Sequence, residues 1–177
     1  MTRRRLPELE SGLEGLRRAP SFAGTLELIV RRPSPGEREL LSSARIDRVE
    51  GLVGDRWSLG KRDPGDQVMV VGSRAAAIFS GSGNHADWAL AGDQLYVDLD
   101  LSHANLPPGT RLAIGSAVVL EVTDEPHLGC GKFVRRFGVD AMKVVNSPQG
   151  RKLRLRGLGT RVVAGGEIRS GDRITKL

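Results

Sequence analysis

A chain of 177 residues with 39% hydrophobic and 27% charged residues has the composition of one folded domain, which excludes a disordered chain. The formal net charge of +6 is compatible with binding of an anionic ligand. The basic residues are scattered, however, and aromatics make up only 4%, which disfavours nucleic-acid binding. No apolar run reaches the ~18 residues of a membrane span, and the first twenty residues lack a secretory signal. We therefore expect a cytoplasmic protein with no membrane partner.

Alternating and apolar runs predict many short strands, and the 23 glycines suit the tight turns between them. We expect residues 1–21 to form an N-terminal lead-in and residues 22–177 one domain. The predicted strands cover residues 25–30, 44–49, 67–71, 95–97, 111–115, 117–122, 158–164, 165–168 and 172–177. The predicted helices cover residues 74–79, with Ser73 as N-cap, 133–137 and 139–145. A two-residue turn, Gly115-Ser116, is expected between the fifth and sixth strands. This pattern favours a β-barrel with small helical insertions over a parallel α/β sheet.

The only cysteine, Cys130, lies between Gly129 and Gly131 just before a predicted helix. A single cysteine excludes an intramolecular disulfide and a multi-cysteine zinc site. The two glycines permit a positive φ and a close approach by a ligand. The helix N-terminus and the basic Lys132, Arg135 and Arg136 are expected to stabilise the thiolate and to attract an anion.

Two alternatives apply to this segment. A lone cysteine often packs as a small buried hydrophobe, although such a residue needs neither flanking glycines nor neighbouring cations. His127 is a candidate general base or, with Cys130, a metal-ligand pair, but a structural hydrogen bond from this loop histidine is the stronger expectation.

The residues around the thiol resemble the MOSC domain, named for the C-terminal domain of molybdenum cofactor sulfurases. The matching stretches are HLGCGKFVRRFGVDA at 127–141, VVN at 144–146 and RGLGTRV at 156–162. Three more agree in order: GLVGDR at 51–56, PGTRLAIG at 108–115 and GGEIRSGDRI at 165–174. The resemblance extends from about residue 22 to residue 177.

The resemblance implies a mainly β fold, a closed and mostly antiparallel β-barrel with a few short helices. It also implies an anionic pterin, the molybdenum cofactor (molybdopterin), with Cys130 as a metal ligand or sulfur acceptor. Relatives include sulfurase tails and reductases of N-hydroxylated compounds, so the chain is either a molybdenum-dependent oxidoreductase or a sulfur-transfer protein. The alternative is a non-enzymatic sulfur or cofactor carrier module acting on a partner protein.

Two further groups follow from the resemblance. Pyridoxal phosphate is associated with the family, but we expect it to belong to the fused sulfurase module, since no lysine here lies in a recognisable Schiff-base setting. The chain has no flavin or iron–sulfur motif, so reductase activity would need a redox partner protein, and sulfur transfer would need a sulfur-donor protein.

The candidate cofactor-binding residues are basic or polar side chains within the matching stretches. Arg156 and Arg161 are five residues apart, on opposite faces of a regular strand, which favours Arg156 as the anion clamp unless a bulge occurs at Gly157 or Gly159. Asp55 is either a contact residue or a turn residue. The chain has Arg56-Trp57 and Asp93-Gln94 where many relatives have a histidine-containing pair and Glu-Asn. The full candidate set is Lys132, Arg156, Arg161, Asp55, Arg56 and Gln94, with Cys130 as catalytic residue and metal ligand.

Overall fold

The computed structural model describes residues 3–60 and 62–177. Within them, seven strands close into a barrel in the order β11-β7-β8-β9-β5-β6-β1, and β1 pairs with β11 to complete the ring. Neighbouring strands are antiparallel except β5 and β6, which are parallel. The closed, mostly antiparallel barrel with a few short helices is therefore confirmed.

The barrel strands are β1 (Ala23–Arg31), β5 (Val68–Gly72), β6 (Leu95–Asp98), β7 (Arg111–Ile114), β8 (Val118–Val122), β9 (Leu158–Ala164) and β11 (Arg173–Lys176). Strand β2 (Glu39–Leu41) adds to the end of β1, and a separate sheet contains β10 (Gly166–Arg169), β3 (Ser43–Asp47) and β4 (Gly51–Leu52). Closure leaves most strand edges paired, which protects the sheet from pairing with other chains.

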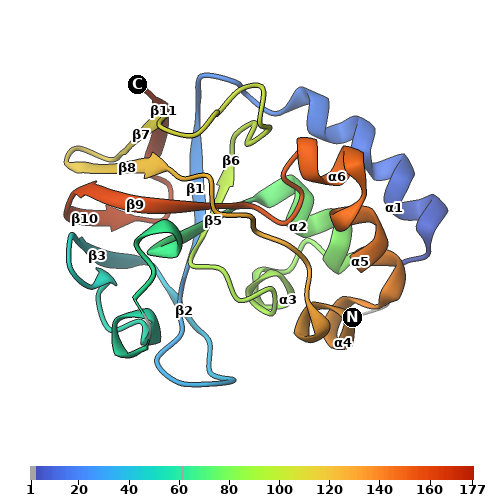
Figure 1. Cartoon of the computed structure of the whole chain (residues 1–177), viewed down its shortest axis with the longest axis horizontal. Helices are drawn as coiled ribbons and strands as arrows, with labels where there is room; N and C mark the ends of the chain where they lie inside the picture. The colour runs from blue at the N-terminus through green and yellow to red at the C-terminus, as the bar shows by residue number, and fades with distance from the viewer. Residues whose placement is uncertain (1–2, 61) are drawn as a thin grey trace.

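Helices gather on one side of the barrel, to the right in Figure 1. They are α1 (Leu6–Gly12), α2 (Ser73–Ser80), α3 (His85–Ala89), α4 (Gly131–Phe137), α5 (Val139–Asn146) and α6 (Pro148–Lys152), with the 3-10 turn η1 (Leu13–Arg18). Two other 3-10 turns, η2 (Arg56–Leu59) and η3 (Pro64–Asp66), lie in the connection between β4 and β5. Leu9 of α1 is buried against the helical layer. None of the helices in the described residues has the length and apolar character needed to cross a membrane.

The hydrophobic core has two parts, separated by the wall of the barrel. Leu26 and Ile29 of β1 pack inside the barrel, whereas Leu28 and Val30 pack against the helices. The pairing of β1 with β6 shifts register between Leu26 and Leu28. Because side chains alternate along a strand, this irregularity is what allows Leu26 and Ile29 to share the interior face.

The helix predictions at 74–79, 133–137 and 139–145 correspond to α2, α4 and α5, and two local predictions were wrong. The N-cap of α2 is Gly72, and Ser73 is the first helical residue. The β7–β8 turn has three residues rather than two, because Ile114 pairs directly with Val118. Gly115 is the first residue of this turn and adopts a positive φ of 58°. A Cβ on Gly115 would meet the Asp172 carboxylate.

We expect Gly157→Ala to destabilise the barrel far more than Gly36→Ala. Both glycines have a positive φ, but a Cβ on Gly157 would lie 2.3 Å from the Val70 carbonyl oxygen, whereas one on Gly36 would meet nothing within 4 Å. Backbone strain alone costs about 1–2 kcal/mol, and the clash should raise the loss at Gly157 to about 3 kcal/mol or more. Urea denaturation measures both losses, and equal losses would contradict this packing.

Candidate functional site: a basic pocket beside Cys130

Cys130 is solvent-exposed and forms the N-cap of α4, so the alternative of a buried core cysteine is wrong. The residue before it is fixed by Asn146 at the end of α5. The Asn146 amide oxygen accepts a hydrogen bond from the Gly129 N–H at 2.8 Å, and its nitrogen donates to the Gly129 carbonyl at 3.1 Å. Asn146 thereby satisfies both backbone polar groups next to the thiol, an arrangement that holds the loop in one conformation.

The two flanking glycines have a different role from the one predicted. Neither Gly129 nor Gly131 adopts a positive φ. Gly129 is required because of close packing, since a Cβ there would lie 2.7 Å from the Met142 sulfur and 3.0 Å from Val145. Gly131 is the first residue of α4.

The pKa of the Cys130 thiol is shifted below its ordinary value. Partial burial of the sulfur acts in the opposite direction and raises the pKa. The backbone N–H groups of Phe133 and Lys132 outweigh this effect by stabilising the thiolate, and the charges of Arg156 and Lys132 lower the pKa further. A thiolate is the nucleophilic and metal-binding form of cysteine, so these neighbours increase its reactive fraction.

The thiol opens onto a pocket of about 310 Å³ that contains six basic side chains. This volume is at the lower end of the range typical of small-molecule sites, about 300–1,000 Å³. Carboxylates are absent from the lining residues. The basic residues lining the pocket are Arg38, Arg56, Lys132, Arg135, Arg136 and Arg156, and we call this cavity the basic pocket.

The segment 89–92, which starts at the last residue of α3, holds three arginines of this pocket and the nearby Arg32. Each of its four successive backbone carbonyls accepts a hydrogen bond from a different arginine. Carbonyls at the end of a helix lack intrahelical partners and favour cations, which explains why guanidinium groups collect here. The pairs are Arg38 with Ala89, Arg136 with Leu90, Arg156 with Ala91 and Arg32 with Gly92.

Asp93, the next residue in the chain, is fully buried between Arg156 and His127. Its carboxylate accepts a hydrogen bond from Arg156 Nη1 at 2.5 Å and contacts His127 Nε2 at 2.7 Å. Burial alone would raise the pKa of Asp93, but Arg156 and His127 hold it well below its usual range. Asp93 therefore stays ionised, fixes Arg156 beside the basic pocket and ties the thiol loop to the barrel through His127.

Arg156 also stacks on the pocket wall. Its guanidinium carbon lies 5.3 Å from the ring centroid of Phe133, within the range of a cation–π contact. Its Nε–H is buried and has no acceptor among residues 3–60 and 62–177. A buried charged group with an unsatisfied donor is costly, and such groups are found at functional sites.

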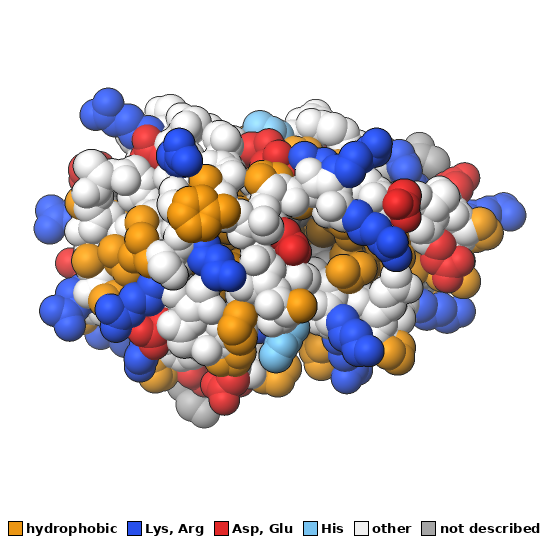
Figure 2. Space-filling view, turned by 90° about the horizontal axis from the view of Figure 1, so that it is seen from above, with side chains coloured by type: hydrophobic (Ala, Val, Ile, Leu, Met, Phe, Trp, Pro, Cys, Tyr) orange, Lys and Arg blue, Asp and Glu red, His pale blue; other side chains and the backbone are white. Residues whose placement is uncertain are grey.

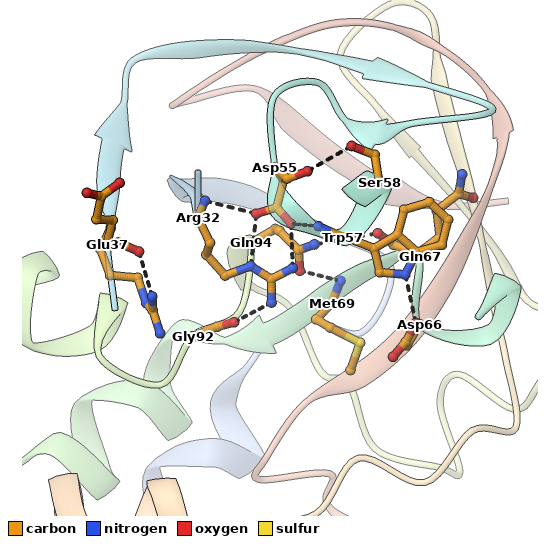
Figure 3. A network of polar contacts seen from close by, with 11 residues as sticks. Arg32, Glu37, Asp55, Trp57, Ser58, Asp66, Gln67, Met69, Gly92 and Gln94 are labelled. Atoms are coloured by element: carbon orange, nitrogen blue, oxygen red, sulfur yellow. Dashed lines mark hydrogen bonds and ion pairs between the residues drawn. The ribbon is translucent and has the colours of Figure 1, made fainter. Parts of the chain in front are cut away.

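Asp55 and Gln94 do not line the basic pocket and belong instead to a network of internal polar contacts (Figure 3). Asp55 is buried, accepts two side-chain hydrogen bonds from Arg32 and caps η2 by accepting from the Trp57 N–H. Gln94 is buried, and its amide oxygen accepts from the Met69 N–H at 3.0 Å. Both side chains are occupied by internal contacts.

Arg161 also lies away from the basic pocket. It is exposed on β9 and forms an ion pair with Glu121 of β8. The structure thus brings together Cys130, Lys132, Arg156 and Arg56 from the sequence-predicted set. It leaves Asp55, Gln94 and Arg161 outside that group. On the face seen in Figure 2, basic side chains are dispersed among neutral and apolar ones.

Two more cavities of about 340 Å³ each adjoin the thiol loop. One includes Arg32, Gly92, Asp93 and His127, and so lies beside the buried carboxylate. The other includes His127 and Arg156 together with part of α6. Arg156 lines both this cavity and the basic pocket.

Sequence reasoning missed two residues of the site. Arg38 follows the turn after β1, and nothing local to it indicates a contact with the carbonyl of Ala89. Asp93 is absent from the predicted set, which contains its neighbour Gln94, although a carboxylate is the better partner for a buried arginine. The available sequence signal for Asp93 was its position directly after Gly92.

The comparisons with known proteins concern the fold. No family model and no curated protein sequence matches the chain. Among solved structures it is similar to YuaD from Bacillus subtilis, with a TM-score of 0.59 and 18% identity over 86% of this chain and 94% of that one. It is also similar to YiiM from Geobacillus stearothermophilus (TM-score 0.61, 14% identity, 87% of this chain and 75% of that one) and YiiM from Escherichia coli (0.58, 15%, 86% and 69%). The chain has a MOSC-like fold.

We expect Lys132→Gln to raise the pH at which Cys130 becomes half-ionised. Loss of an exposed neighbouring cation should move the midpoint up by about 0.2–0.7 pH units. Iodoacetamide alkylation rates measured against pH give the midpoint, because only the thiolate reacts. Lys143→Gln on the neighbouring helix α5 is the matched control and should leave the midpoint in place. Equal shifts in both variants would contradict a local effect.

We expect Asp93→Asn to cost most stability at neutral pH and less as the pH falls towards 3. The pKa of Asp93 is lower in the folded than in the unfolded state, so its contribution is present above about pH 4 and is lost as pH falls further. Leaving buried Arg156 without its carboxylate should cost about 3–5 kcal/mol at pH 7. Urea denaturation between pH 7 and pH 3 measures this difference, with the exposed Asp124→Asn as control. A loss that does not shrink in acid would refute the assignment.

Proposed function

We propose that the basic pocket binds the anionic pterin of the molybdenum cofactor, with Cys130 as metal ligand or sulfur acceptor. The observation that carries the proposal is the convergence of an exposed thiol and six basic side chains on one pocket. The MOSC-like fold supports it, since the resemblance noted in the sequence associates that fold with this cofactor.

The residues present fit the chemistry of the group. Molybdopterin carries a phosphate, and arginine guanidinium groups bind phosphate through paired hydrogen bonds. A thiolate is a soft ligand and suits molybdenum better than an oxygen-only pocket would. Arg156, which lines the same pocket, has a buried Nε–H with no acceptor among the described residues.

Each residue has a distinct task in this proposal. Lys132 and Arg156 attract the anionic ligand and stabilise the Cys130 thiolate. Asp93 orients Arg156, and Asn146 holds the backbone before the thiol. The bound cofactor would supply redox chemistry at its metal, and the pocket would position it.

The lowered pKa and the exposure of Cys130 also favour a role as sulfur acceptor. The thiolate would attack the outer sulfur of a persulfide on a donor protein, forming a new S–S bond at Cys130. The donor's S–S bond would break, and the donor would leave as a thiolate, so no outside oxidant or reductant is required. This is the non-enzymatic carrier version of the proposal.

The ligand role is tested by loading purified wild-type protein and Cys130→Ser with molybdenum cofactor and measuring molybdenum by mass spectrometry. We expect at least a tenfold loss of bound metal in Cys130→Ser, with pterin partly retained through the basic side chains. Arg161→Gln, outside the pocket, should load like wild type. Unchanged molybdenum in Cys130→Ser would sink the ligand role.

The carrier role has its own readout. After incubation with a persulfide donor, intact-mass analysis should show one added sulfur atom on wild-type protein and none on Cys130→Ser. Absence of added sulfur on wild type would exclude the carrier version. Turnover of an N-hydroxylated compound by loaded protein with a reductant would exclude a purely non-enzymatic carrier.

A further inference from the structure

We propose that the basic pocket contains a second phosphate subsite, formed by Arg38 and Arg136 across Gly92, and therefore takes a ligand that carries a diphosphate group. This inference rests on the proposed function, which places an anionic ligand in the part of the pocket next to Cys130. It adds a distal subsite to which the sequence analysis assigned nothing.

The geometry of the pair depends on Gly92. A Cβ at this position would lie 3.1 Å from Arg38 Nη2 and 3.7 Å from Arg136 Nη1, so the two guanidinium groups approach the same backbone point from different elements. Gly92 also has a positive φ of 89°, which other residues rarely adopt. A side chain at position 92 would push the Arg38 guanidinium away from the Arg136 guanidinium.

Both guanidinium groups are held in place and still have donors to offer. Arg38 donates through Nε to the Ala89 carbonyl and through Nη1 to the Glu37 carbonyl, and Arg136 donates through Nη1 to the Leu90 carbonyl. Among residues 3–60 and 62–177, no acceptor contacts Arg38 Nη2 or the Nε and Nη2 of Arg136. Such a pre-positioned pair with unused N–H groups suits a phosphate, which accepts several hydrogen bonds.

No carboxylate among residues 3–60 and 62–177 neutralises the charge on this pair. The nearby Arg32 and Arg156 form ion pairs with Asp55 and Asp93, whereas Arg38 and Arg136 form none with a described carboxylate. Burial lowers the pKa of Arg38, and the charges of Arg136, Arg56 and Arg32 lower it further. The pair therefore maintains like-charge repulsion that a bound anion would relieve.

One phosphate leaves this distal charge uncompensated. A phosphate monoester carries about −1.5 to −2 at neutral pH, which Lys132 and Arg135 beside Cys130, both unpaired among the described residues, already match. Arg156 is paired with Asp93, so three cations of the same pocket, Arg38, Arg56 and Arg136, remain and call for a second phosphoryl group. A diphosphate fits this need, and it has two sources: a dinucleotide form of the pterin cofactor or a free nucleoside diphosphate.

The test compares inorganic pyrophosphate with inorganic phosphate by calorimetric titration of the purified protein. We expect pyrophosphate to bind at least tenfold more tightly, and Arg38→Gln and Arg136→Gln to reduce this ratio towards one. Arg38→Lys, which keeps the charge but loses the fork, should have an intermediate ratio, and Arg161→Gln should behave like wild type. Urea denaturation confirms that each variant is folded. Equal binding of the two anions, or an unchanged ratio in both glutamine variants, would overturn the proposal.

Two further arms separate the sources and the two proposals. In the first arm, the ligand that copurifies with the protein is treated with nucleotide pyrophosphatase, and release of a nucleoside monophosphate identifies a dinucleotide cofactor. In the second arm, tight binding of ADP or GDP by pterin-free protein identifies a nucleoside diphosphate. Failure of both arms overturns the diphosphate assignment. Cys130→Ser should retain the pyrophosphate preference, so loss of the thiol's role leaves the distal subsite standing and the two failures are distinguishable.

Discussion

The site depends on the four carbonyls of residues 89–92, each of which holds the guanidinium of a different arginine. These arginines come from the chain after β1, from α4 and from the segment before β9. One short stretch after α3 therefore gathers parts of the chain that are far apart in sequence. Backbone carbonyls neutralise none of the positive charge, so this arrangement fixes Arg38 and Arg136 while leaving their charge available to an anion.

A division between paired and unpaired cations follows from this arrangement. Arg32 and Arg156 are buried with Asp55 and Asp93, and their ion pairs hold the barrel end together. Buried charges require such partners, because desolvation is costly. The other cations of the basic pocket have no carboxylate partner among the described residues, and the exposed Cys130 lies among them. They are Arg38, Arg56, Lys132, Arg135 and Arg136. The interior pairs thus support the position of the side chains that face a ligand.

Much of the fold is readable from the sequence because it depends on local pattern. The alternation in β1 and the apolar run of β5 predict strands, and the turn before α4 predicts a reactive thiol near a helix start. The pocket is less readable, because Arg38 and Asp93 meet Arg136 and Arg156 only through barrel closure. Gly129 was predicted to supply a positive φ, whereas its role is to pack against α5, a contact that local sequence does not reveal.

The most direct test of this account is the metal and pterin content of protein purified from a host that makes molybdenum cofactor. The account predicts molybdenum and pterin in near-equal amounts, both approaching one per chain. Purified, folded protein that contains neither, from a host shown to load another molybdenum protein in the same cells, would contradict it.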